Sequence, residues 1–189
     1  MSPMQVRVAL SALVPFLLGA GCALPRPWGE GVGLQANFLG GYRALDHPTL
    51  EGHATAGGEL VTHDPENGWG YELGGSYGSE SLGGPREHEA EIDELYLGLR
   101  RSWVEEGRSL QPYLGFGASW VRVENGISSP TFEFDDDSGG AYLRGGALWS
   151  LGRFAFDRGT EIFVGVEGRG LIGDEVDSVQ FALVLGFGR

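Results

Sequence analysis

The sequence predicts an all-β fold, an eight-stranded antiparallel up-and-down β-barrel, on three observations. Apolar residues alternate with small or polar residues along eight segments, a period typical of strands whose two faces differ. The chain has 34 glycines among 189 residues, without a collagen-like period. An interior glycine costs a helix about 1 kcal/mol relative to alanine, whereas it suits curved sheets. The connections between the segments also alternate between short and long.

The beginning of the chain has the composition of an export signal. Arg7 is followed by an apolar run over residues 8–18 and by three small residues before Cys22. Because this run is shorter than the roughly 20 residues that a membrane-spanning helix needs, we interpret residues 1–21 as a signal peptide. Residues 22–29 are then a short N-terminal linker, and residues 30–189 form the barrel.

Cys22 is the only cysteine, so the chain forms no intrachain disulfide and no cysteine-based metal site. The segment Leu18-Gly19-Ala20-Gly21-Cys22 resembles the lipobox of bacterial lipoproteins. This resemblance implies lipidation of Cys22, which would anchor the linker. Lipoboxes usually have leucine three residues before the cysteine, where this chain has Gly19. Ordinary cleavage near Ala23 is the alternative.

Eight segments carry the alternation, and the last is the clearest. In residues 179–187 every second residue is large and apolar, whereas the second segment alternates poorly. Most segments reach the roughly 9–11 residues that a tilted strand needs to cross a membrane. The predicted strands are residues 31–44, 54–63, 68–79, 90–103, 109–123, 139–151, 160–171 and 179–187.

Short and long connections follow one another along the chain. Those at 64–67, 104–108 and 152–159 are fairly tight, whereas those at 45–53, 80–89 and 124–138 are longer and more polar. The last connection, 172–175, is short. An even-stranded membrane barrel with both termini on one side has this pattern, with short periplasmic turns and longer outer loops.

The two faces of the predicted strands differ in composition, which indicates their orientation. One face collects glycine with large polar residues, a poor water-facing surface but a suitable filling for a narrow eight-stranded lumen. We therefore predict that the apolar face points outward into lipid. A soluble barrel with this face packed inward is the alternative. Aromatic residues of the apolar face would form interfacial girdles, and they are Phe38, Tyr42, Trp69, Tyr71, Tyr77, Trp103, Trp120 and Trp149.

Charged residues of both signs fall on the predicted inner face in near balance. Since a buried charge without a partner is costly, this balance predicts pairing inside the barrel. Arg43 lies on the same face, but we expect it in water at a strand end. For Glu94 a position in water at a strand end is an alternative to pairing inside the barrel. The predicted interior charge network consists of Glu72, Glu94, Arg100, Arg144, Glu167 and Arg169.

The segment Gln111-Pro112-Tyr113-Leu114-Gly115-Phe116-Gly117 and the closing strand 179–187 resemble small outer-membrane barrels of the outer-membrane protein A transmembrane-domain type. The resemblance covers about residues 30–189. It implies a location in the bacterial outer membrane, with membrane lipid and lipopolysaccharide as surroundings. It also implies the barrel-assembly machinery as a transient partner. That family commonly ends on an aromatic residue, whereas here Phe187 is followed by Gly188 and Arg189.

Little in the composition points to chemistry. The net charge of −13, from 26 acidic and 13 basic residues, leaves no basic stripe for nucleic acid. The acidic run 133–137 lacks the spacing of an EF-hand loop, so we interpret it as a solvated loop rather than a Ca²⁺ site. Ser79, Ser81, His88 and Glu89 match no nucleophile motif. We therefore predict no catalytic residues, no metal and no cofactor.

The expected function is a non-enzymatic outer-membrane barrel with a structural, envelope-integrity or surface-interaction role. A lumen filled by side chains is not an open pore, and a monomer is favoured. One alternative is an outer-membrane lipid-modifying enzyme with a rim histidine among His47, His53 and His88. Another is a lipid-anchored periplasmic barrel that binds an apolar ligand inside.

Overall fold

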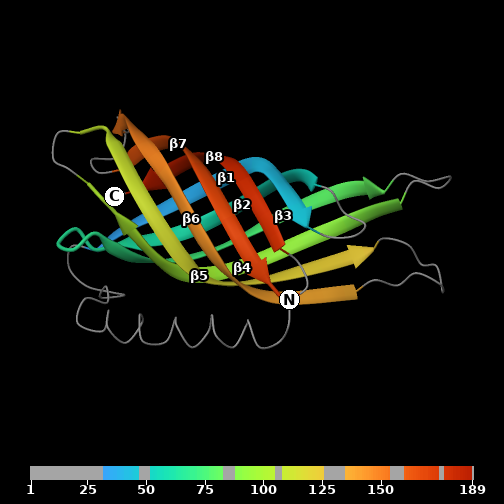
Figure 1. The fold of residues 1–189 in the computed structure, drawn as a ribbon. Coiled ribbons are helices and arrows are strands. Elements are labelled where there is room, and N and C mark those ends of the chain that lie inside the picture. The colour runs from blue at the N-terminus through green and yellow to red at the C-terminus, as the bar shows by residue number, and fades with distance from the viewer. Residues whose placement is uncertain are drawn as a thin grey trace.

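Eight strands form a closed barrel in the computed structural model of the protein (Figure 1). Each strand pairs antiparallel with the next, and β1 pairs with β8 to close the sheet. This confirms the predicted all-β, eight-stranded, up-and-down architecture. The strands are β1 (Gly33–Asp46), β2 (Gly52–His63), β3 (Trp69–Leu82), β4 (His88–Ser102), β5 (Leu110–Asn125), β6 (Asp135–Arg153), β7 (Glu161–Gly173) and β8 (Asp177–Gly188).

The structure describes residues 32–46, 52–82, 88–104, 108–125, 135–153, 160–174 and 177–188. The predicted signal peptide and the lipidation of Cys22 lie outside these residues. Within the described ranges no helix has the length and apolarity that crossing a membrane requires.

The predicted strands all occur, including the poorly alternating second one, but several run further than expected. β1 continues to Asp46, and β6 begins at Asp135 instead of residue 139. The placement of Asp135 to Asp137 in a loop is therefore wrong. In the β5–β6 ladder Arg122 lies opposite Asp137, and Val123 lies opposite Asp136. An opposite-charge pair and a β-branched neighbour favour a ladder enough to offset the low strand propensity of aspartate.

The two ends of the barrel differ in shape. The turn end holds the β2–β3, β4–β5 and β6–β7 connections together with both ends of the sheet, Gly33 and Gly188. At the opposite, loop end the β2–β3 pairing stops at Thr55 and Gly78, whereas the β3–β4 pairing continues to Leu82 and His88. Strands β3 to β6 therefore project beyond the rest, as Figure 1 shows.

The apolar face of the strands points outward, away from the lumen. Leu97 is 62% exposed, Phe181 67% and Leu183 70%. Leu99 has the same outward parity but is buried, between Tyr71 on β3 and Phe116 on β5 in the register. A contiguous apolar wall of this kind is foreign to soluble monomers. The alternative in which this face packs inward is therefore wrong.

Candidate functional site

The lumen of the barrel is filled by three layers of side chains. Toward the loop end lies an apolar cluster that includes Leu45, Ile92 and Val121. Toward the turn end lies a second apolar cluster that includes Leu148 and Phe163. Charged and polar side chains occupy the space between them. Within the described lumen, apolar groups therefore lie on both sides of the polar layer.

The polar layer has equal numbers of positive and negative groups. All of its charged side chains are buried, with at most 6% of each residue exposed. Burying charge is costly unless each charge has a partner, so this balance is what permits the layer to exist. Its charged members are Arg43, Arg100, Arg144, Arg169, Glu59, Glu72, Glu94 and Glu167.

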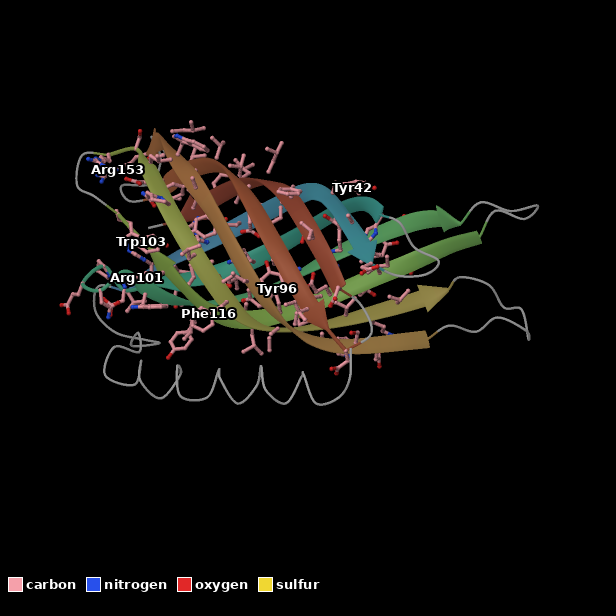
Figure 2. The ribbon with its side chains drawn as sticks, in the orientation of Figure 1. Tyr42, Tyr96, Arg101, Trp103, Phe116 and Arg153 are labelled. Atoms are coloured by element: carbon pink, nitrogen blue, oxygen red, sulfur yellow. The ribbon has the colours of Figure 1, made fainter. Side chains whose placement is uncertain are left out.

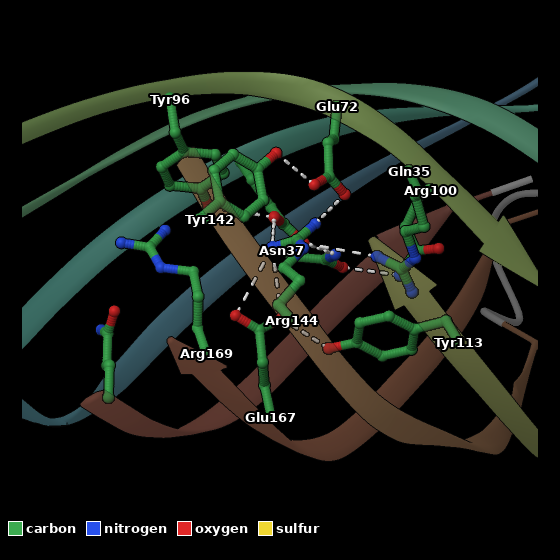
Figure 3. Close-up of polar contacts among 12 residues, drawn as sticks. Gln35, Asn37, Glu72, Tyr96, Arg100, Tyr113, Tyr142, Arg144, Glu167 and Arg169 are labelled. Atoms are coloured by element: carbon green, nitrogen blue, oxygen red, sulfur yellow. Dashed lines mark hydrogen bonds and ion pairs between the residues drawn. The ribbon is translucent and has the colours of Figure 1, made fainter. Parts of the chain in front are cut away.

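Arg144 on β6 is the main hub of the network (Figure 3). Its Nη1 donates to Glu59 on β2 and, at 3.2 Å, to Glu167 on β7, while its Nη2 donates to Glu72 on β3. One guanidinium thus joins three carboxylates from three other strands. Charge-assisted bonds of this kind are stronger than bonds between neutral groups.

Three buried tyrosines complete the coordination of these carboxylates. The Tyr96 hydroxyl donates to Glu59 at 3.0 Å, and the Tyr113 hydroxyl donates to Glu167 at 2.6 Å. Tyr142 donates to Glu72 in the same way. The centroids of the Tyr96 and Tyr113 rings lie 5.5 Å and 5.8 Å from the Arg144 guanidinium carbon. Tyr96 and Tyr142 belong to the loop-end cluster and Tyr113 to the turn-end cluster, so their rings pack with apolar groups while their hydroxyls bind the carboxylates.

Glu94 on β4 is a second hub, nearer the loop end. It accepts hydrogen bonds from Arg43 on β1, Arg169 on β7 and Ser119 on β5. Arg43 is 1% exposed, so its expected position in water is wrong. The reason is that β1 extends to Asp46, which leaves Arg43 below the buried Leu45 of the loop-end cluster.

The structure brings the six predicted network residues into this layer together with two others, Arg43, which was expected in water, and Glu59, which the prediction omitted. Arg100 contacts Glu59 at 3.4 Å and lies 3.6 Å from the centroid of the Tyr113 ring. Glu59 also accepts a bond from Asn37 at 2.6 Å. Glu59 was missed because β2 has few large apolar residues to set its phase. The available signal was that Glu59 has the opposite parity to Leu60, the large apolar residue next to it.

Glycines on the inner face make room for these large side chains. A β-carbon at position 98 would lie 2.3 Å from the Tyr142 hydroxyl and 2.3 Å from the Phe116 carbonyl oxygen. One at position 115 would lie 2.9 Å from a Glu72 carboxylate oxygen. The high glycine content therefore serves the packing of the lumen.

Where the structure describes them, the candidate rim histidines lie in strands and not in loops. His53 lies within β2 and is 3% exposed, so its expected place in an outer loop is wrong. His88 also belongs to a strand, where the register places it opposite Leu82, while Ser81 lies opposite Glu89. His47 lies outside the described residues. Among the residues that the structure describes, no group of three or more histidine, cysteine or acidic side chains is placed to hold a metal ion.

Comparison with known proteins by sequence gives no match. No protein-family model matches the chain, and no curated protein matches it either.

Comparison of structures is informative. Ail, the attachment invasion locus protein of Yersinia pestis, is 9% identical, with a TM-score of 0.58 over 85% of this chain and 100% of that one. Neisserial surface protein A is 12% identical, with a TM-score of 0.53 over 83% of this chain and 96% of that one. The N-terminal β-barrel domain of Pseudomonas aeruginosa OprF is 16% identical, with a TM-score of 0.51 over 83% and 97%. An apolar outer wall, a charge-balanced lumen and these similarities together give the chain the fold of the small eight-stranded bacterial outer-membrane barrels.

Proposed function

We propose that the protein is a non-enzymatic integral barrel of the bacterial outer membrane. The observation that carries this proposal is the reversed polarity of the fold, with exposed leucine and phenylalanine outside and eight paired charges inside. Such a wall needs hydrocarbon around it, and a closed barrel is the one sheet that leaves no unpaired edge within a bilayer. Outer-membrane lipid and lipopolysaccharide are then its surroundings, and the barrel-assembly machinery its partner during biogenesis.

The role we propose is mechanical or adhesive rather than conductive. The projecting part of the sheet carries exposed acidic side chains, among them Glu91, Asp93 and Asp137. This favours contact with cationic groups over polyanions. Ail has been crystallised with the heparin analogue sucrose octasulfate, and the acidic projection gives no support for a ligand of that charge here. In planar bilayers we expect no steady conductance of the porin kind.

The location is tested by fractionation of cells that express the full chain. We expect the protein in the outer membrane, extractable only with detergent, and with a gel mobility that changes on boiling as the barrel unfolds. The variant Cys22→Ala distinguishes attachment through a lipid on Cys22 from attachment through a membrane-spanning barrel. Release of this variant without detergent would refute the integral barrel, whereas retention supports it.

The absence of enzymatic activity is tested on lipid A. In the described lumen the Ser119 hydroxyl donates to Glu94, but both side chains are buried inside the barrel, so we expect an unchanged lipid-A profile on expression of the chain. A changed profile that is lost in His47→Ala, His53→Ala or His88→Ala would instead establish a lipid-modifying enzyme.

A further inference from the structure

We propose that Arg101, Trp69 and Trp103, here called the Arg101 cluster, form a binding site for the phosphate of an anionic glycerophospholipid in the periplasmic leaflet. Arg101 lies on the outward face of β4, close to the turn end. Figure 2 shows Arg101 and Trp103 near one another at the end opposite to Tyr42. The inference rests on the proposed membrane location and adds a specific ligand to it.

The first observation is an exposed cation held by aromatic rings. The guanidinium carbon of Arg101 lies 5.6 Å from the ring centroid of Trp69 and 5.6 Å from that of Trp103. Trp69 is its register partner on β3, so the backbone ladder fixes their proximity. Cation–π contacts with two indoles restrict the position of the guanidinium without using its N–H donors in hydrogen bonds, and the fork of these donors matches two phosphate oxygens.

The second observation is that Arg101 has no acidic partner within the described part of the chain. Arg153, by contrast, is an exposed arginine of the turn end that forms an ion pair with Glu161 at 3.1 Å. The acidic residue in the adjoining β2–β3 turn, Asp64, accepts bonds from the Glu66 amide at 2.9 Å and the Asn67 side chain at 3.0 Å. Among the described residues, none neutralises the charge of Arg101, which is therefore available to an anionic ligand.

The third observation is an apolar surface that begins where the cation ends. Leu97 and Leu95 follow Arg101 along the outward face of β4 and are 62% and 54% exposed. Leu114, the register partner of Arg101 on β5, is 51% exposed. A cation above a leucine column complements an amphiphile with a phosphate and acyl chains. Tryptophan and arginine also concentrate at the depth where lipid headgroups meet hydrocarbon. A free phosphate would contact only the Arg101 guanidinium and not the leucine column.

The test measures the affinity of the detergent-solubilised full chain for the first bound phosphatidylglycerol molecule, by native mass spectrometry. Arg101→Gln is expected to weaken phosphatidylglycerol binding about five- to tenfold, the contribution of one arginine at an anionic surface. Arg153→Gln is the matched control, an exposed arginine of the same end, and we expect less than about a twofold change. Trp103→Ala is expected to fall between the two, because Arg101 then keeps only one ring.

Two results would overturn the proposal. Equal effects of Arg101→Gln and Arg153→Gln would mean that the protein attracts anionic lipid without a site. Displacement of the lipid by inorganic phosphate would mean that the leucine column contributes nothing. Insertion of the same samples into phosphatidylcholine vesicles, judged by protection from protease, is measured in parallel. Failure to insert refutes the membrane barrel itself, whereas insertion without lipid preference refutes only the site.

Discussion

Replacing Arg144 with methionine should lower the free energy of unfolding far more than replacing an exposed arginine such as Arg153. Arg144 is 1% exposed and bridges Glu59, Glu72 and Glu167. Methionine fills part of its volume but leaves four lumenal carboxylates facing three arginines. Removing one partner from a buried ion pair costs about 3–5 kcal/mol, because the remaining charge is left uncompensated. That corresponds to a roughly 150- to 5000-fold smaller folding constant.

The assay is reversible unfolding in urea from lipid vesicles, followed by tryptophan fluorescence and by gel mobility. Arg153→Met is the matched control, because its side chain is 72% exposed and its pair with Glu161 is worth about 0–1 kcal/mol. Adding Glu72→Gln to Arg144→Met restores equal numbers of charges. We expect this double variant to recover about 1–3 kcal/mol of the loss. A free energy of unfolding for Arg144→Met within about 1 kcal/mol of the control would refute the charge-balance reasoning.

Three further predictions concern packing, solvent and strand length. Gly98→Val should lower the free energy of unfolding by about 1–3 kcal/mol or prevent folding, because the new side chain would collide with a lumenal tyrosine. Gly170→Ala should change the free energy of unfolding little, since no atom lies within 4 Å of the added β-carbon. Equal losses of stability in Gly98→Val and Gly170→Ala would contradict the packing account. Leu183→Arg should cost about 2–4 kcal/mol in vesicles, and an unchanged stability there would contradict a lipid-facing position. Arg122→Glu places like charges opposite Asp137 and should speed amide exchange in the projecting β5–β6 ladder, whereas unchanged protection would show that the pair does not support it.

The architecture could be predicted because it depends on local alternation. In β8 every second residue from Val179 to Phe187 is large and apolar, and this pattern alone fixes the phase of the strand. The orientation followed from the opposite phase, where glycine with arginine and glutamate suits only a narrow lumen. Strand ends were less predictable at the loop end. There the ladder depends on a cross-strand neighbour such as Arg122 opposite Asp137, which single-strand propensity does not include.

The site was predicted in kind but not in its contacts. Which face of the sheet a side chain occupies can be judged from phase. Which carboxylate faces which guanidinium across the lumen depends on the stagger of the closed sheet. Glu59 escaped because its strand lacks bulky apolar residues. Arg43 was misplaced because its depth depends on the β1–β8 closure, where it lies opposite Gln180. These are long-range facts that local sequence does not contain.

The order in which the strands are synthesised has a consequence for assembly. Glu72 on β3 receives its ionic bond from Arg144 on β6, and Glu94 on β4 receives one of its two from Arg169 on β7. A nascent sheet of the first few strands therefore carries inward carboxylates whose counter-ions have not yet arrived. Hydrocarbon tolerates no such intermediate, so hairpins of this chain cannot enter the bilayer one at a time as stable species. Insertion and closure should occur as one cooperative event, and a fragment ending after β5 should remain outside the membrane.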